Sequence, residues 1–554
     1  MAKKTSLKDL KKKRDLAVQF RKDTWDDDAR AGVNFYLYGT HEALEDIVRS
    51  RDSHHDRKAN YVFSTIEGII PKMFDRVPGF TVLPRGNDDV EKAPRLELIM
   101  KYKFDRVLDF ETAAKDASRD MLTTGLGYFK LTWGFKEGEK KDEDDVADVF
   151  EDDLRLEVID PFDVFITAGD KKIQEAEGVF QQMFLTEDEA KLKWPKAKEL
   201  KAEHFIGTFD EQKKDQFGKT AKRVHIWEYH GRVKNKETVI VFTDKEILNE
   251  REPYEHGRRP LIDIADYRLS REYYARGEVF NLAPLQEELH EIDLQLSAHR
   301  KRLMNPKKFV LKDAVDNVNM TRLKDPRANI VEMNNINDIR WEPTAPISND
   351  AYNIRQIKKE DIGLMSGINE QSRGGAEKVV KTATGQSILS DATAGRIRDK
   401  VRTVSKAFEE LLQQAQGLLA QFQDAEGQVK ITDTEGDVFA KFTKEDIKGG
   451  FDFEIDIVES MPFLRDKRAQ SALALFQEFK GDPDVDQIGL KKKVMKLAFQ
   501  DVNADELVVV PEPVEETPVE APEPIPQEGA FPPELPQLPP QGIPQEAPPG
   551  IPAF

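Results

Sequence analysis

The chain has 554 residues, of which 39% are hydrophobic and 34% charged, and its formal net charge is −19. This length allows several domains with ordinary cores. The excess of 103 Asp and Glu over 84 Lys and Arg argues against a protein that wraps nucleic acid on a basic face, because such binding neutralises many phosphates. The absence of cysteine excludes disulfide frameworks, thiolate metal sites and cysteine nucleophiles. We expect neither a secretory signal nor a membrane span, since no apolar run approaches roughly 18 residues.

Up to about residue 125 the sequence is expected to be mainly helical, with a short strand at 80–84. One apolar stripe with helical spacing consists of Val62, Ile66, Ile69 and Met73. From residue 125 to 265 the apolar period changes to two, which is typical of half-buried strands. Phe129, Leu131 and Trp133 there alternate with polar residues. This part of the chain is therefore predicted to be an α+β domain with an antiparallel sheet.

Residues 277–304 are predicted to form a long helix with a narrow apolar seam. The seam positions step by three and four residues and are Leu282, Leu285, Leu289, Ile292, Leu296, His299 and Leu303. A 3.5-residue repeat places one thin stripe against a neighbouring helix rather than a broad face against a core. Short strands are expected within 305–346, followed by a return helix within 347–366. The order is thus long helix, small β-module, return helix.

A second seam follows in a helix expected from about Gly385 to Asp424. Its positions are Ile397, Val401, Val404, Phe408, Leu411, Ala415, Leu418 and Phe422. At ~1.5 Å per residue the helix would be about 60 Å long, which exceeds what a compact domain needs. Gly385, Gly395 and Gly417 are predicted bends, because glycine weakens helix interiors. We expect both seams to be too thin to be satisfied within one chain, so that copies of the chain stand side by side around an open axis.

The composition changes at the C-terminus, where half of the 30 prolines lie from Pro511 onward. Residues 508–554 are rich in Pro, Glu and Gln and are predicted to be a disordered tail with polyproline-II character. A solvated tail is the simpler interpretation. The alternative is an arm that recognises a partner, since such segments dock into aromatic grooves.

No segment of the sequence fits an active site, a metal site or a cofactor site. Residues 217–220 end like a phosphate-binding loop, but Lys213 stands where that motif needs glycine. Residues 501–512 imitate a calcium loop without its turn glycine. The acidic run at 142–148 is expected to be a solvated loop, because like charges repel one another. We therefore predict no catalytic residue, no metal and no cofactor.

Several segments resemble, in the expected order, the portal protein of tailed double-stranded-DNA bacteriophages. They are Pro78-Gly-Phe80-Thr-Val82-Leu-Pro84, Gly125-Leu-Gly127-Tyr-Phe-Lys130-Leu-Thr-Trp133, Val158-Ile-Asp160-Pro161-Phe-Asp163-Val, His256-Gly257-Arg-Arg259-Pro260, Gly277-Glu278 leading into Leu285-Gln286, and Thr382-Ala383-Thr384. With the order of helices and β-module, the resemblance covers roughly residues 20–470. Gly385 stands where many relatives carry Glu, and the Pro-rich C-terminus is not a general feature of the family.

The resemblance implies a division of the chain into the regions of a portal subunit. These regions are 1–276 (wing), 277–304 (first stem helix), 305–346 (clip), 347–366 (second stem helix), 367–384 (tunnel loop), 385–507 (tunnel helix and crown) and 508–554 (disordered tail). The implied fold class is α+β, with helices and an antiparallel sheet in the wing, paired stem helices and a long tunnel helix.

The resemblance also implies function and partners. Family members form rings of twelve at the unique vertex of the capsid, through which double-stranded DNA passes without sequence specificity during packaging and ejection. The implied partners are the large terminase subunit, then head-completion or adaptor proteins, and the major capsid and scaffolding proteins, with no membrane. The implied location is the virion, and the host cytoplasm during assembly. Two other classes remain open: a non-portal virion scaffold or adaptor, and a nucleic-acid-packaging ATPase or nuclease.

Two sets of residues are expected to carry this role, neither of them enzymatic. The inter-subunit seam is expected to use Leu285, Leu289, Ile292, Leu296, Leu303, Ile397, Val401, Val404 and Phe408. The DNA-channel candidates are Arg373, Lys378 and Lys381 in the Gly- and Lys-rich loop between the two seams. We expect these three cations to make weak contacts with phosphates, whereas an ordinary flexible loop is the competing interpretation.

Overall fold

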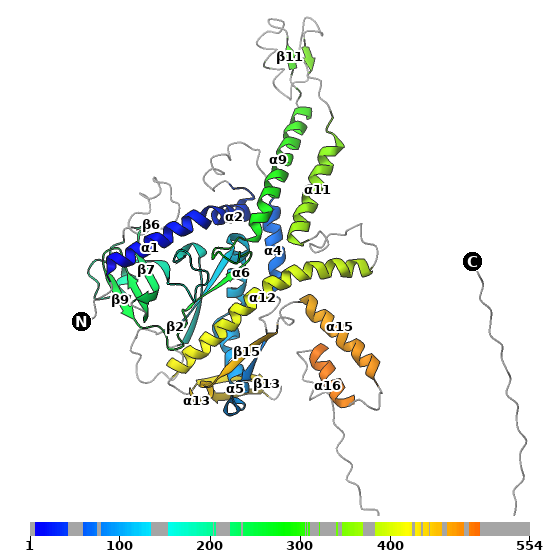
Figure 1. The fold of residues 1–554 in the computed structure, drawn as a ribbon. Helices are drawn as coiled ribbons and strands as arrows, with labels where there is room; N and C mark the ends of the chain where they lie inside the picture. Colours follow the sequence, from blue (N-terminus) through cyan, green and yellow to red (C-terminus); the bar gives the residue numbers. More distant parts are fainter. Residues whose placement is uncertain are drawn as a thin grey trace, which may run out of the picture. The chain divides into compact units, whose positions relative to one another are not determined.

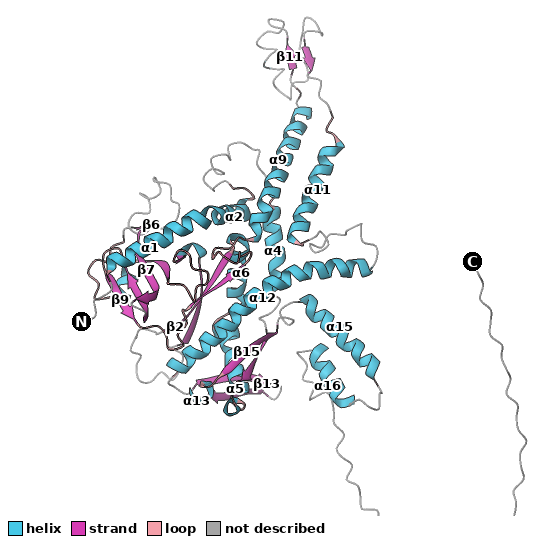
Figure 2. Cartoon of the chain, viewed as in Figure 1, coloured by secondary structure: helices cyan, strands magenta, loops and turns pink. Residues whose placement is uncertain are grey.

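The computed structural model divides the chain into two compact units, Met1–Ser471 and Ala472–Phe554. The residues that it describes are 6–41, 59–74, 79–134, 153–202, 204–205, 222–233, 236–304, 306, 308–310, 321, 339–341, 346–368, 383–423, 427–433, 436–442, 444–456, 462–480 and 487–498. Figure 1 follows these residues along the chain, and Figure 2 separates helices from strands.

The first unit mixes helices and antiparallel strands, as expected for an α+β fold. Its helices are α1 (Leu7–Arg21), α2 (Asp27–Tyr38), α4 (Tyr61–Met73), α5 (Ala93–Tyr102), α6 (Phe110–Thr124), α7 (Glu187–Lys193), α9 (Glu278–Met304), α11 (Asn349–Ser366), α12 (Ala383–Phe422) and α13 (Lys444–Ile447). Its strands are β1 (Gly79–Pro84), β2 (Leu126–Gly134), β3 (Asp153–Ile159), β4 (Val164–Ile166), β5 (Gly178–Leu185), β6 (His204–Phe205), β7 (Lys222–Val233), β8 (Lys236–Phe242), β9 (Ile247–Arg251), β10 (Leu261–Ala265), β11 (Lys308–Val310), β12 (Ile339–Trp341), β13 (Gly427–Asp433), β14 (Gly436–Phe442) and β15 (Phe451–Asp456).

Two antiparallel sheets occupy the region between residues 125 and 265, which confirms the sequence prediction. In the smaller sheet β2 lies between β10 and β3. The larger sheet has the order β4-β5-β7-β8-β9, and β6 also pairs with β7. Helix α1 covers one face of the larger sheet, where Leu10 and Ala17 pack with Phe180 and Tyr229. A capping box starts α7, where the Thr186 side chain accepts from the amide of Glu189 and the Glu189 side chain accepts from the amide of Thr186.

The predicted order of long helix, β-module and return helix is confirmed by α9, the β11–β12 pair and α11. Helices α9 and α11 run antiparallel and side by side (Figure 1). Two ion pairs join them: the Arg355 guanidinium lies 2.5 Å from the Asp293 carboxylate, and Lys358 Nζ lies 2.8 Å from Glu288 Oε2. The two helices therefore form a pair within a single chain.

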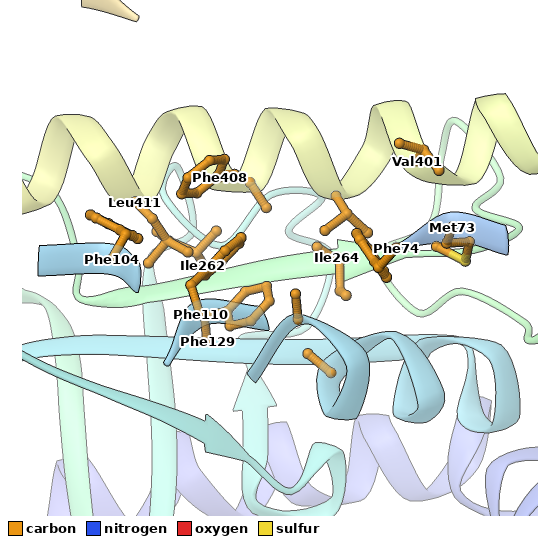
Figure 3. Packing of buried hydrophobic residues seen from close by; sticks show 14 of the residues in the cluster. Met73, Phe74, Phe104, Phe110, Phe129, Ile262, Ile264, Val401, Phe408 and Leu411 are labelled. Atoms are coloured by element: carbon orange, nitrogen blue, oxygen red, sulfur yellow. The ribbon is translucent and has the colours of Figure 1, made fainter. Parts of the chain in front are cut away.

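Helix α12 is one continuous helix of 40 residues that crosses the core of the first unit. Its aromatic centre is Phe408, whose ring stacks on Phe110 with centroids 4.2 Å apart and meets the edge of Phe104 at 5.2 Å (Figure 3). The helix passes through Gly395 and Gly417 without interruption, and bends at the glycines stay a prediction. Residue 417 is glycine for another reason. A Cβ there would lie 2.7 Å from the Cβ of His256, so the missing side chain lets the segment that carries His256 approach α12 closely.

Strands that lie far apart in the sequence pair with one another next to α12. Strand β1 pairs with β15 along its whole length, from Gly79 opposite Asp456 to Pro84 opposite Phe451. The hairpin β13–β14 precedes α13. Helix α15 (Pro462–Phe479) spans the boundary between the two units, and α16 (Gln487–Ala498) belongs to the second. Within the described ranges, no helix combines the length and the apolar character that a bilayer span requires.

Candidate functional site

Two of the resembling segments, 125–133 and 277–286, meet at the start of α9, and two glycines make this possible. Gly125 has a φ of +100°, and a Cβ there would lie 2.2 Å from the carbonyl oxygen of Ala275. A Cβ on Gly277 would lie 2.5 Å from the carbonyl oxygen of Leu122. No side chain fits at either distance, so only glycine lets the α6–β2 turn pack directly against the backbone that leads into α9.

A buried ion cluster joins this junction to α12. Lys400 of α12 is only 8% exposed; its Nζ lies 3.0 Å from Oε2 of Glu278 and also pairs with the carboxylate of Asp266. Tyr267 donates its hydroxyl to the same Glu278 oxygen at 2.7 Å, and its ring centroid lies 4.3 Å from Lys400 Nζ. We call Lys400, Asp266, Glu278 and Tyr267 the stem-base cluster.

The stem-base cluster holds one cation between two carboxylates. Burial opposes the charge of Lys400, but Asp266 and Glu278 outweigh it and raise the pKa of Lys400 above its ordinary value. Burial raises the pKa of Asp266 to about 7, although Lys400 acts in the opposite direction. The Oδ2 atom of Asp266 is buried and has no hydrogen-bond partner among the described residues. Asp266, Tyr267 and Lys400 line a groove of about 540 Å³ between α9, α11 and α12.

A second buried network joins the smaller and the larger sheet and corrects the prediction for β2. Lys130 is buried, with Nζ 2.5 Å from Glu228 Oε2 on β7 and 2.6 Å from Gln181 Oε1 on β5. Both faces of β2 are therefore buried, whereas the alternation of the sequence predicts one polar face. Burial opposes the charge of Glu228, yet Lys130 holds its pKa well below its ordinary value. From the sequence alone, a lysine that pairs with a buried carboxylate cannot be distinguished from a lysine that faces solvent.

The segment 256–260, one of the resembling motifs, is seated on α12. Gln414 of α12 donates its side-chain amide to the carbonyl oxygen of Arg259 at 3.0 Å, and Gly417 leaves room for His256. The buried Arg259 guanidinium donates to the carbonyl oxygens of Ile173 and Ala176, both at 2.6 Å. The motif is thus a structural link between α12 and the larger sheet.

The seam predicted on α12 is not available to another subunit. Ile397, Val401, Val404 and Phe408 are at most 3% exposed and belong to the chain's own core, so their predicted inter-subunit role is wrong. The physical reason is visible along the helix. Ala407, Leu412 and Leu419 are buried as well, and they widen the thin stripe into the broad face of a core helix. Elements that the spacing does not reveal, among them α4, β2 and β10, cover this face.

The seam predicted on α9 is divided along the helix. Leu289 is buried in the same core, which contradicts an inter-subunit role for it, and Leu285 packs against that core half-buried. Ile292 and Leu296 are half-buried and line a groove of about 330 Å³ between α9 and α11. Leu303 is half-buried near the end of the helix. For Leu285, Ile292, Leu296 and Leu303, contact with another copy stays a prediction.

Helix α11 carries an exposed apolar stripe that the sequence reasoning missed. Ile354, Ile357 and Leu364 are 47%, 53% and 76% exposed. Ile357 and Leu364 lie on the side of α11 away from Arg355, whereas Ile354 is one turn from Lys358 and lines the groove between α9 and α11. The steps from 354 to 357, from 357 to 361 and from 361 to 364 repeat the seam spacing, but Asp361 interrupts the apolar series. This spacing is the sequence signal from which the stripe could have been predicted.

The other candidates cannot be placed. Arg373, Lys378 and Lys381 lie outside the described residues, and so do the segments 142–148, 217–220 and 501–512. Most of the predicted clip and the whole predicted tail lie outside them as well. Among the residues that the structure describes, no three His, Asp or Glu side chains form a group that could hold a metal ion.

Comparison with known proteins gives three findings. A family model described as phage SU10 portal protein matches residues 146–460, which is more than half of the chain. One solved structure, the neck of an empty GTA particle computed with C6 symmetry, aligns with 82% of this chain and 94% of its own, at 10% identity and a TM-score of 0.39. No curated protein matches. The chain therefore belongs to the phage SU10 portal protein family, and its role is that of a portal, a structural connector of a phage particle.

Proposed function

We propose that copies of this chain form a closed ring around an open axis, at the unique vertex of a phage capsid, and that double-stranded DNA passes through it. In this proposal residues 1–276 are the wing, α9 and α11 the stem, 305–346 the clip, 367–384 the tunnel loop and 385–507 the tunnel helix and crown. The family membership supports the role. A ring of twelve is what the resemblance implies.

The observation that carries the ring is the bare stripe on α11. Ile357 and Leu364 are large apolar side chains in water, on a helix whose opposite face is already occupied by α9. Burying them against a neighbour would contribute roughly 1.5–3 kcal/mol per side chain, repeated at each interface. The apolar groove lined by Ile292, Leu296 and Ile354 lies on the same helix pair. A stripe on one copy that packs beside the groove of the next makes a heterologous contact, which gives a ring when the rotation from copy to copy closes on itself.

The net charge supports a conduit rather than a DNA-binding clamp. A subunit with a charge of −19 repels the duplex, and salt limits this repulsion to roughly 8–10 Å. Firm contacts between cations and phosphates, multiplied around a ring, would arrest the DNA. Arg373, Lys378 and Lys381 are then the exception, as weak and sequence-independent contacts. Replacing all three by Ser should reduce packaging or retention of DNA, and unchanged packaging and retention would remove these residues from the proposal.

The partners follow from the same role. The clip would receive the large terminase subunit during packaging and then head-completion or adaptor proteins, while the crown and wing face the major capsid and scaffolding proteins. Assembly would take place in the host cytoplasm, and the finished ring would be a component of the virion. Pull-down of the purified terminase by wild-type chain, but not by a chain with altered clip residues, tests the first of these contacts.

The ring is tested by placing charge on the stripe. The double variant I357D/L364D should fold as the wild type does but stay monomeric, because an unpaired charge buried in an interface costs several kcal/mol. The control is Gln356→Asp, which adds one negative charge at an exposed position of α11 outside the stripe. Mass photometry and electron microscopy of the full chain are the readouts. Rings of wild-type size in the double variant would show that α11 does not form the interface.

A further inference from the structure

We propose that Lys400 is the residue that fixes α12 on the base of the stem, and that the ionisation of Asp266 sets how firmly it does so. The inference concerns a contact within one subunit. It therefore holds or fails independently of the ring, and its failure would leave the stripe on α11 untouched.

The position of Lys400 supports this role. Its ammonium group reaches Asp266, which directly follows β10, and Glu278, the first residue of α9. One buried cation thus contacts the wing sheet, the stem helix and α12 at the same point. Tyr267 completes the enclosure with its ring, and the Asp266 amide donates to the carbonyl oxygen of Gly125 at 3.1 Å. Through that hydrogen bond the cluster is tied to the glycine junction beneath it.

One carboxylate oxygen of the cluster has no hydrogen-bond partner among the described residues. Glu278 contacts both Lys400 and Tyr267, whereas Asp266 pairs with Lys400 through Oδ1 and its buried Oδ2 is the unsatisfied oxygen. A buried carboxylate with an unsatisfied oxygen is costly when ionised and much less so when protonated, because the proton removes the charge. The junction is therefore firm while Asp266 is protonated and weaker when Asp266 is ionised.

The charged groups around Asp266 come from each element that packs there. Lys400, Arg396 and Asp399 lie on α12 and line the same groove, Glu278 lies on α9, and Tyr267 follows Asp266 in the turn. Arg396 is engaged elsewhere, since it donates to the carbonyl oxygen of Leu364 at the end of α11. Helix α11 adds Met365 to the groove, which carries no charge. Lys400 is thus the cation that Asp266 can use.

The direction of the pH effect follows from the raised pKa of Asp266, about 7 against an ordinary value of 3.8. An acid whose pKa is higher in the folded state stabilises the fold at low pH, and this contribution is lost as the pH rises through the folded-state pKa. Between pH 6 and pH 8 the contribution of Asp266 to the folding equilibrium constant should fall about tenfold. The variant D266N, which has no ionisable group there, should lack this decrease.

The test compares hydrogen exchange of the backbone amides of residues 397–404 at pH 6 and pH 8 in the full chain. Between these pH values the protection factors in the wild type should fall about tenfold more than in D266N. The matched control is Asp399→Asn, an exposed carboxylate on the rim of the same groove, which should behave like the wild type. Equal pH profiles in the wild type and D266N would overturn the role of Asp266.

The role of Lys400 is separated from general stability by two further variants. K400M leaves two buried carboxylates without a cation, so its amides at 397–404 should exchange faster at pH 8 than at pH 6 by more than in the wild type. The triple variant K400M/D266N/E278Q removes every charge of the cluster and should fold, with protection factors at 397–404 that are lower than in the wild type and the same at pH 6 and pH 8. Wild-type protection in the triple variant would show that Lys400 does not hold α12.

Discussion

Helices α12 and α11 have similar apolar spacing in the sequence and opposite surroundings in the structure. On α12 the seam residues from Ile397 to Phe408 are covered by other elements of the same chain. On α11 the stripe of Ile354, Ile357 and Leu364 is 47–76% exposed among the described residues, and Arg355 and Lys358 hold the helix to α9 by ion pairs. Spacing therefore identifies an apolar face, whereas only the fold decides whether the chain itself or another copy covers that face.

The difference can be recognised along each helix. Buried positions on α12 form a broad face, because Ala407, Leu412 and Leu419 add a second row beside the first. On α11 only Ile362 and Ser366 are buried, both near its C-terminal end, and Asp361 interrupts the exposed stripe. A broad apolar face belongs to a core, and a narrow interrupted one is typical of a contact between helices.

The largest effect is expected on α12. Phe408→Ala should lower the free energy of unfolding by about 3–5 kcal/mol, because it opens a cavity where Phe110 and Phe104 meet. Urea unfolding followed by circular dichroism measures this change. A decrease in the free energy of unfolding of less than about 1 kcal/mol would mean that α12 is not part of the core and that its seam residues are exposed.

Gly395 and Gly417 of α12 offer a matched pair of substitutions with opposite expected effects on stability. Gly417→Ala should destabilise the fold by about 1–3 kcal/mol, since the new Cβ would lie 2.7 Å from His256. Gly395→Ala meets nothing within 4 Å and should stabilise the helix by up to about 1 kcal/mol. Thermal unfolding of both variants measures the contrast. Equal shifts in the two would contradict the seating of the 256–260 segment on α12.

Beneath α12, helix α6 should make stability depend on pH. Burial raises the pKa of Asp120 to about 7, and Asp160 and Asp116 add to this. Because the folded state favours the protonated acid, stability is lost as the pH rises through 7, by about 1.4 kcal/mol between pH 6 and pH 8. Chemical unfolding should show this loss in the wild type to be larger than in D120N by that amount. Identical slopes would show that Asp120 is not buried in the folded chain.

The smallest effect on the single subunit is expected on α11. Ile357→Ala should change its free energy of unfolding by less than about 0.5 kcal/mol, because the side chain is half in water already. The same variant should weaken assembly, measured as the concentration at which rings dissociate in mass photometry. A loss of several kcal/mol in the single subunit would mean that this face packs on its own chain, as that of α12 does.

The sequence was sufficient for much of the fold, because local periodicity and end signals determine helices. The paired helices α9 and α11 and the long α12 are where the pattern places them. The sequence was insufficient to predict the burial of residues whose partners lie far away along the chain. Lys130 appears solvent-facing until Glu228 of β7 is beside it, and Lys400 acquires its role only when Asp266 and Glu278 lie within reach.

Electron microscopy of the purified full-length wild-type chain tests the central claim most directly. The account predicts closed rings with a central opening wide enough for duplex DNA, in which α11 of each copy lies against its neighbour. A population of single subunits at micromolar concentration, or closed assemblies with no opening along the axis, would contradict it.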